Sequence, residues 1–188
     1  MQYFPTNLVS VQYVFNTLEN FKGQPDEVLL VVRQEAIQKL GELAIDISND
    51  IQKVADRYQL QINRAKILTS VAAITGALTS IVSNAIPSTP KAQDTENADS
   101  ENANKAQAKI QLVNSVGTIL TLISGTLAVV SSQNSIKAQT ELQTLQLKLQ
   151  NVLNGIKSIQ DIQDKANSST LSPSTVGIGL VVLVLLFK

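Results

Sequence analysis

Two uncharged stretches decide the fold: ILTSVAAITGALTSIVSNAI at residues 67–86 and IQLVNSVGTILTLISGTLAVV at residues 110–130. No charged residue occurs between Lys66 and Lys91, and the second uncharged run continues as far as Ile136. A helix of about 20 apolar residues is long enough to cross ~30 Å of hydrocarbon. The two stretches therefore predict a pair of apolar helices that form a hairpin.

Polar residues dilute both stretches and leave a second interpretation open. Threonine, serine and asparagine recur through each of them. A leucine-rich membrane anchor would hold fewer such residues, so the hydropathy also fits the core of a soluble helical bundle. We favour contact with a membrane and keep the protein core as the alternative. Residues 87–109 between the stretches hold two prolines, four acids and three lysines, and they are expected to form a polar loop.

Residues 25–86 are predicted to form one long helix that ends in the first apolar stretch. Pro25 and Asp26 suit its first turn, because proline fits there and an acid faces the positive end of the helix. Apolar residues then recur in steps of three and four, a coiled-coil register. The register comprises Ile37, Leu40, Ala44, Ile47, Ile51, Val54, Tyr58, Gln61, Ala65 and Leu68, and continues through Ala72, Thr75, Thr79, Val82 and Ile86.

Residues 110–166 are predicted to form the returning helix, with the same change of side-chain size along its seam. Its charged half shows Ala138, Leu142, Leu145, Leu149, Val152, Ile156 and Ile159 in steps of three and four. The same register traced back towards the loop passes through Ser135, Ser131, Ala128, Ser124, Thr121 and Gly117. The bulky residues of the apolar half fall off this seam, namely Leu120, Leu122, Ile123, Leu127, Val129 and Val130.

This change from large to small seam residues is the main indication of a membrane. In water the burial of leucine and isoleucine drives helices together. In lipid that drive is absent, and helices associate through small residues and hydrogen bonds instead. The predicted membrane or helix-packing residues of the hairpin are Ala72, Gly76, Ser80, Gly117, Thr121 and Ser124.

The predicted fold class is therefore all-α: a long antiparallel hairpin with a coiled-coil-like stalk and an apolar distal part. We call the two predicted long helices, residues 25–86 and 110–166, the arms of the hairpin. A break within either arm would instead fold the chain into a four-helix bundle, and Gly41 and Gly155 are the candidate positions for such a break.

The two ends of the chain form separate units. Residues 1–24 predict an amphipathic helix, capped by Thr6 or Asn7 and closed by Gly23, that packs on the hairpin. A position at a membrane surface is the alternative for this helix. Residues 167–175 form a linker. Residues 176–188 (VGIGLVVLVLLFK) form a hydrophobic tail, helix or strand, for which we favour membrane anchoring. Its predicted contact residues are Leu180, Leu183, Leu186 and Phe187.

The composition argues against most catalytic chemistry. The 188 residues include no histidine and no cysteine, which removes the commonest general base, disulfides and thiolate metal sites. Fifteen basic residues balance fifteen acidic ones, so no basic field favours nucleic acid. Phosphate loops, dinucleotide fingerprints and zinc spacings are absent from the sequence. We expect no enzyme activity, no cofactor, no metal and no small-molecule substrate, and the first residues do not resemble a secretory signal peptide.

The leading functional hypothesis is a non-enzymatic, membrane-associated structural protein that inserts or anchors a helical hairpin in a bilayer. Its partners would be lipid and other copies of itself or other proteins of an assembly. A minor membrane protein of a virus or phage particle is one context that fits the small size. The first alternative is an α-helical pore-forming protein, and the second is a soluble coiled-coil scaffold with a hydrophobic docking tail. The sequence leaves open the oligomeric state, the identity of the partner and the host membrane.

Overall fold

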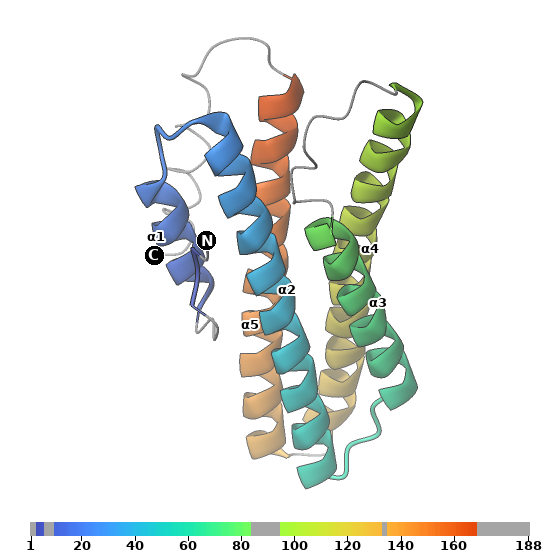
Figure 1. Ribbon diagram of the computed structural model, residues 1–188. Coiled ribbons are helices and arrows are strands. Elements are labelled where there is room, and N and C mark those ends of the chain that lie inside the picture. The colour runs from blue at the N-terminus through green and yellow to red at the C-terminus, as the bar shows by residue number, and fades with distance from the viewer. Residues whose placement is uncertain (1–2, 6–9, 84–94, 133–134, 169–188) are drawn as a thin grey trace.

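The computed structural model describes residues 3–5, 10–83, 95–132 and 135–168. Within these ranges helices are the only regular secondary structure, which confirms the all-α prediction. The helices are α1 (Val11–Asn20), α2 (Asp26–Arg57), α3 (Arg64–Ser83), α4 (Thr95–Ser132) and α5 (Ile136–Ser168), as Figure 1 shows.

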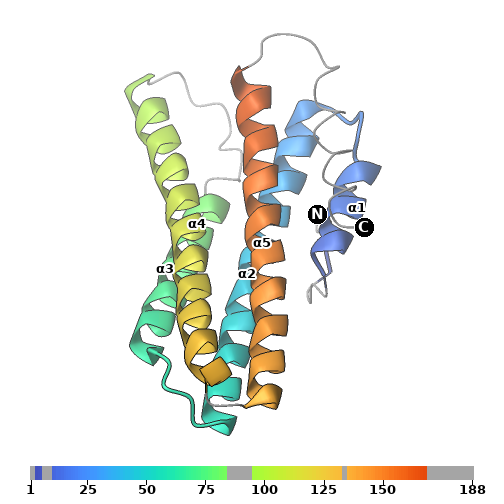
Figure 2. The same ribbon diagram turned by 180° about the vertical axis from the view of Figure 1, so that it is seen from behind.

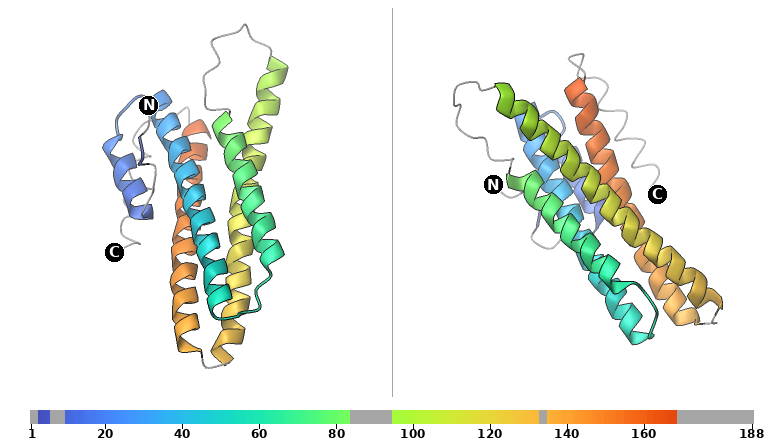
Figure 3. Two further views of the ribbon diagram at one scale, coloured as in Figure 1. Left: turned by 60° about the horizontal axis from the view of Figure 1, so that its bottom comes forward. Right: turned by 90° about the vertical axis from the view of Figure 1, so that its right-hand side faces the viewer.

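Helices α2 to α5 form an antiparallel bundle in which each helix runs opposite to the one before it. Helix α2 packs against α3 and α5, and α4 packs against the same two helices (Figures 1 and 2). The C-terminal ends of α2 and α4 and the N-terminal ends of α3 and α5 lie at the same end of the bundle (Figure 2). Helix α1 contacts α2 and α5 and lies outside the four, as the left view of Figure 3 shows.

The predicted continuous helices over residues 25–86 and 110–166 are each divided into two. Helix α2 begins at Asp26, as expected, but ends at Arg57, and α3 follows from Arg64. The returning arm is divided between Ser132 and Ile136. The elongated hairpin is therefore folded back on itself, and the four-helix bundle kept as the alternative is the arrangement observed.

The break after α2 is built from residues that carry no glycine or proline signal. The Leu60 amide donates to the Ala55 carbonyl over 2.8 Å, and the Gln59 amide donates to the Asp56 carbonyl over 3.2 Å. These two bonds form a Schellman motif, in which Gln59 takes the left-handed position with φ 52°. A residue with a side chain costs about 1–2 kcal/mol in this conformation, so the tertiary fold must hold it there.

The start of α3 is fixed by a cap and by burial. Asn63 Oδ1 accepts a hydrogen bond from the Lys66 amide over 3.0 Å, which satisfies one of the free donors of the first turn. Ile62 is only 9% exposed and anchors the connection in the core. Asparagine is a common residue at helix N-caps, so Asn63 is a local signal for a new helix, although the register predicted a continuous one.

Gly41 and Gly155 lie inside helices and provide close packing, so their prediction as breakpoints is wrong. A Cβ atom added to Gly41 would lie 2.6 Å from Leu78 Cδ2 on α3. A Cβ atom added to Gly155 would lie 3.1 Å from Val11 Cγ1 on α1. Each glycine therefore lets a neighbouring helix approach α2 or α5 more closely than a larger residue would allow.

The predicted seam of the charged half is buried from Ile37 to Val54 and from Ala138 to Ile159, and Tyr58 is half-buried. Bulky residues in steps of three and four face one another there because their burial drives association in water. Beyond the break the continuation of this seam through Gln61, Ala65 and Leu68 is exposed. The buried residues of the seam on α2 and α5 are each less than 9% exposed and comprise Ile37, Leu40, Ala44, Ile47, Ile51, Val54, Ala138, Leu142, Leu145, Leu149, Val152, Ile156 and Ile159.

Helix α1 packs on the bundle and is shorter than the predicted residues 1–24. Its buried residues are Val14, Phe15 and Leu18. Ser10 is the observed N-cap, with its Oγ accepting from the Tyr13 amide over 3.3 Å. The predicted caps Thr6 and Asn7 lie outside the described residues. Gly23 adopts φ 88°, a left-handed conformation that glycine reaches without strain, and it lies in the turn into α2.

Two further boundaries differ from the predictions. Helix α4 begins at Thr95, so the predicted loop 87–109 is helical from Thr95 onwards. Helix α5 extends to Ser168 and takes in the first two residues of the predicted linker. The remainder of that linker and the tail 176–188 lie outside the described residues.

Candidate functional site

The α3–α4 half of the bundle carries no ionisable side chain over most of its length. No aspartate, glutamate, lysine or arginine occurs in residues 67–83 of α3 or in residues 110–132 of α4. The faces that these segments turn outwards therefore hold neutral groups only. Exposed positions include Leu68, Thr69, Ala72, Thr75, Gly76, Thr79, Ile110, Gln111, Asn114, Thr118, Thr121, Ser124, Gly125, Ala128 and Val129. We call this set of residues the neutral face.

The structure places four of the six predicted small residues of the hairpin on the neutral face. Ala72, Gly76, Thr121 and Ser124 are exposed. Ser80 and Gly117 are the two half-buried members of the predicted seam. Leu180, Leu183, Leu186 and Phe187 of the tail lie outside the described residues.

The small size of the glycines on these two helices is not used for packing within the chain. A Cβ atom added to Gly76, Gly117 or Gly125 would meet nothing within 4 Å. The predicted packing of these helices on one another through small residues is therefore not seen in the bundle. Their contact with lipid or with another chain stays a prediction.

Bulky residues off the predicted seam occupy most of the buried positions of α3 and α4, together with the small residues Ser70, Ala77, Ala108, Ser115 and Thr126. Leu120, Ile123 and Val130, which lie off the predicted seam, are buried. The three-and-four spacing of Leu112, Val116, Ile119 and Ile123 was visible in the sequence as a competing register. The buried side chains of α3 and α4 include Ile67, Ile74, Leu78, Ile81, Leu112, Val116, Ile119, Leu120, Ile123 and Val130.

Hydroxyl groups along α3 and α4 bond to their own helices. Thr75 Oγ1 donates to the Val71 carbonyl over 3.0 Å, and Thr121 Oγ1 donates to the Gly117 carbonyl over 3.0 Å. Hydroxyl donors satisfied in this way need neither water nor another helix, so these polar residues are compatible with an apolar solvent. The same bond to the carbonyl four residues earlier is made by Thr69, Thr79, Ser80, Thr118, Ser124 and Thr126.

An open groove between α3 and α4 is lined by neutral polar groups. Its volume is about 690 Å³. Carboxamides of α4 dominate the lining, which includes Asn104, Gln107, Gln111 and Asn114. Among the described residues that line this groove, none carries a carboxylate, amine or guanidinium. Within the described ranges no three acidic side chains come together as a metal site would require.

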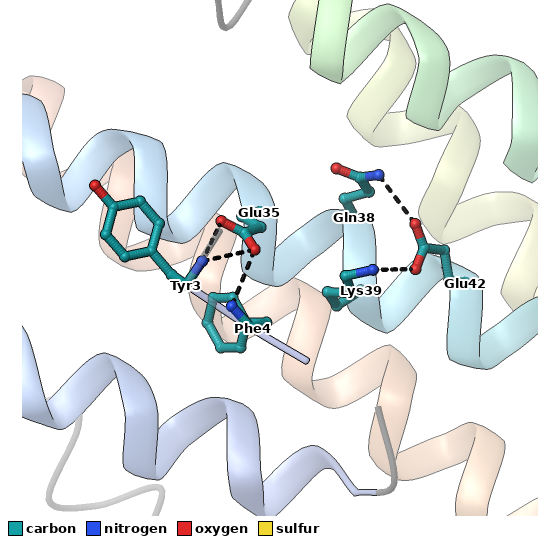
Figure 4. A network of polar contacts seen from close by, with 6 residues as sticks. All are labelled: Tyr3, Phe4, Glu35, Gln38, Lys39 and Glu42. Atoms are coloured by element: carbon teal, nitrogen blue, oxygen red, sulfur yellow. Dashed lines mark hydrogen bonds and ion pairs between the residues drawn. The ribbon is translucent and has the colours of Figure 1, made fainter. Parts of the chain in front are cut away.

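Polar contacts of α2 link it to the N-terminal segment, to α5 and to α3. At one end, Glu35 of α2 accepts hydrogen bonds from the amides of Tyr3 and Phe4, each 3.0 Å long (Figure 4). Lys39 and Glu42 form a 2.8 Å ion pair on the same helix (Figure 4). The Glu35 contacts fix the N-terminal segment on α2.

At the other end of the bundle, polar contacts join α2 to α5 next to the break. Glu141 of α5 accepts from Arg57 Nη1 over 2.8 Å and from Tyr58 Oη over 2.7 Å. The hydrogen bond to Glu141 raises the pKa of the Tyr58 phenol above its usual range. Arg64 and Asp56 form an ion pair across the connection between α2 and α3. All of these groups have structural partners, and nothing in their geometry resembles a nucleophile beside a base.

One helix among the described residues has the length and composition of a membrane span. The segment Ala106–Ser131 of α4 is long and apolar enough to cross a bilayer, and 39% of its most apolar window is buried. A buried core helix of a soluble protein has the same properties, so this finding is a weak indication. No known protein family, curated protein or solved structure matches the chain.

Proposed function

We propose that this chain is a non-enzymatic, membrane-associated helical protein whose α3–α4 pair contacts lipid as part of a larger assembly. The observation that carries the proposal is the neutral face. Water-exposed protein surfaces normally hold about 25–35% charged residues. Helices α3 and α4 have none along residues 67–83 and 110–132, although their outer sides are exposed in the isolated chain.

Large apolar side chains on the same face support the proposal. Leu68 is 57% exposed, Ile110 is 60% exposed and Val129 is 54% exposed. Single exposed apolar residues are common on soluble proteins. Here they share a surface with internally bonded hydroxyls and without any charge, which is the composition that a lipid-facing or partner-facing helix tolerates.

The opposite half explains why an assembly is part of the proposal. Helices α2 and α5 carry most of the charged residues of the bundle, with exposed ion pairs such as Lys53–Asp50 and Arg57–Glu141. This half suits water or the polar surface of another subunit. Other copies of the chain, or other proteins, would contact it while α3 and α4 contact the membrane.

A matched pair of lysine substitutions tests the membrane contact. Thr121 on α4 and Thr144 on α5 are both exposed, and both donate to the carbonyl four residues earlier. A lysine in the middle of a membrane helix costs about 2.5–3.5 kcal/mol. We expect Thr121→Lys to abolish the carbonate-resistant association of the full chain with liposomes, and Thr144→Lys to leave it unchanged.

The same experiment shows what would contradict the proposal. Both variants should keep the helical circular dichroism of the parent protein in water, because both positions are exposed there. If Thr121→Lys floats with liposomes as well as the parent does, α3–α4 is not the membrane contact. If the parent itself does not float, the neutral face is a protein interface and the soluble scaffold becomes the better interpretation.

The pore-forming alternative is favoured by one specific observation. Helix α4 has a bulky apolar side that includes Leu112 and Val116. Its opposite side carries amides and hydroxyls, such as those of Asn114 and Thr118. A helix of this kind suits a position with lipid on one side and water on the other. Release of an entrapped dye from liposomes would favour the pore, whereas flotation without release would favour a structural role.

A further inference from the structure

We propose that the bundle opens on membranes by straightening both of its breaks, so that α2 joins α3 and α4 joins α5 in one extended helical hairpin. This inference rests on the proposed membrane function and adds the conformational change by which a water-soluble bundle would deliver α3 and α4 to lipid. It is carried by the helical phase of two opposite faces on α3 and α4.

The first face is the one buried in the bundle, with Ile74 and Ile81 on α3 and Ile119 and Ile123 on α4. Most of its residues are large and apolar, and the small residues Ser70, Ala77, Ser115 and Thr126 are buried beside them. In water the large apolar residues must be covered, and the four-helix arrangement covers them.

The second face is the small-residue part of the neutral face, and on α3 it is in phase with the core of α2. Ala72 lies 18 residues after Val54, which is about five whole turns at 3.6 residues per turn. If the chain were helical through residues 58–63, Ala72, Thr75 and Thr79 would continue the buried seam of α2. In the bundle these three residues are exposed.

The returning arm has the same relationship. Steps of three and four backwards from Ala138 reach Ser131, Ser124 and Thr121, all of which are exposed in the bundle. A residue of one face and a residue of the other are two positions apart in the sequence, as Thr121 and Ile119 are. Two positions correspond to about 200° around the helix, so the two faces lie on opposite sides of it. Straightening the breaks would therefore exchange the inner and outer faces of both helices together.

The exchange suits the change of solvent. In lipid the bulky side chains gain nothing by facing one another, while small residues let two helices approach closely. An extended hairpin would hold its small residues between the arms and turn Ile74, Ile81, Ile119 and Ile123 towards the lipid. The hydroxyls already bonded within their helices would need no rearrangement.

The α2–α3 connection is built so that it can become helical. Residues 58–63 contain no glycine or proline. Gln59 is held at φ 52°, a conformation that a helix would relieve. The ion pair between Arg64 and Asp56 spans the connection in the bundle. In a continuous helix these two residues would lie about 12 Å apart along the axis, so the ion pair would be lost on straightening.

A reversible cross-link tests the opening. The chain has no cysteine, so introduced thiols are unique. Gln146 Nε2 donates to Ser124 Oγ over 3.0 Å, which places α5 and α4 side by side across their break. In one continuous helix the 22 residues between them would span about 33 Å. A short disulfide-containing cross-linker between Ser124→Cys and Gln146→Cys would therefore lock the bundle closed.

The matched control joins Arg57→Cys to Glu141→Cys with the same reagent. Arg57 Nη1 and Glu141 Oε2 are 2.8 Å apart and connect α2 to α5. Helices α2 and α5 form the stalk of the extended hairpin as well as one half of the bundle. These two positions thus stay neighbours in both states, and this cross-link leaves the opening free.

We expect the Ser124–Gln146 cross-link to abolish carbonate-resistant association of the full chain with liposomes, and reduction to restore it. The Arg57–Glu141 cross-link should have no effect. If the first cross-link leaves association intact while Thr121→Lys abolishes it, the chain contacts lipid without opening and this inference is overturned. If neither the cross-link nor Thr121→Lys reduces association, the proposed function fails as well.

Discussion

The two halves of this bundle both bury large apolar residues and differ in what they expose. In the α2–α5 half, the seam read along the sequence is the buried seam, and the outer surface carries charged residues beside the exposed Ile136 and Leu147. In the α3–α4 half, the residues that continue the same seam are exposed, and the outer surface holds no charge along residues 67–83 and 110–132.

The difference shows that the exposed residues of a helix, more than its buried ones, vary with the solvent or partner around it. The largest fully buried side chains in both halves are isoleucine and leucine, because water drives large apolar residues inwards. Exposed residues do not have to be large and apolar to stabilise the bundle. Under the proposed function, their chemistry in α3 and α4 reflects contact with lipid or a partner. Three experiments test the comparison between the halves, beginning with the largest expected effect.

Truncation of one isoleucine in each half tests whether the halves form one cooperative core. Ile119 of α4 and Ile156 of α5 are both 0% exposed. Replacing a buried isoleucine by alanine removes packing and leaves a cavity, at a cost of about 2–5 kcal/mol. We expect both Ile119→Ala and Ile156→Ala to lower the free energy of unfolding by amounts in this range, measured by urea denaturation followed by circular dichroism.

The ratio of the two losses in unfolding free energy shows whether α3 and α4 belong to the same core as α2 and α5. Similar losses mean that α3–α4 folds onto α2–α5 in water. A large loss for Ile156→Ala with none for Ile119→Ala would mean that α3 and α4 are not packed in the soluble protein, and the contrast between a buried and an exposed face would have no basis.

Substitution of Gln59 distinguishes the bent arm from a continuous one. At a left-handed position glycine avoids the strain of a side chain, so Gln59→Gly should stabilise the bundle by about 1 kcal/mol. Within a continuous helix the same change would destabilise by about 1 kcal/mol. The midpoint of urea unfolding in water should therefore rise.

The matched control for Gln59 is Gln61→Gly in the same connection. Gln61 is exposed and does not have a positive φ, so glycine relieves no strain there and only adds freedom to the unfolded chain. We expect this control to lower the urea midpoint slightly. Equal decreases for the two variants would show that the chain does not bend at Gln59 in solution.

The smallest effect concerns the contact beside the break. The hydrogen bond to Glu141 raises the pKa of Tyr58, so the folded state holds the phenolic proton more tightly than the unfolded chain does. This contribution to stability is complete below the unfolded pKa of about 10 and is lost as the pH rises through the folded value. Tyr58→Phe should therefore lower stability slightly at neutral pH and lose less stability than the parent above about pH 10.

Comparison with Tyr13→Phe isolates this contribution, since Tyr13 is 47% exposed on α1. Urea midpoints of the three proteins on either side of the tyrosine pKa would give the result. A parent and a Tyr58→Phe variant that lose stability in parallel would show that the Tyr58–Glu141 contact does not join α2 to α5 in solution.

The sequence by itself determined the helices and much of the core. Steps of three and four from Ile37 to Val54 and from Ala138 to Ile159 identified buried residues, because these segments alternate large apolar and charged side chains and water separates the two. The uncharged character of α3 and α4 was likewise a property of composition. The all-α class followed from these patterns.

Only the tertiary structure decided where the arms bend and which face of α3 and α4 is buried. Two registers compete in these helices, a bulky one through Ile74 and Ile119 and a small one through Ala72 and Thr121, and periodicity does not rank them.

The bend after α2 determines which of the two registers of α3 is buried. A Schellman motif at Gln59 and a cap at Asn63 turn α3 back against α2 with its bulky side inwards. Those local signals are weak in the sequence, because neither glycine nor proline marks the bend. The burial of Ile62 and the close contact of Leu78 with Gly41 stabilise the bend. These contacts exist only once the helices have packed.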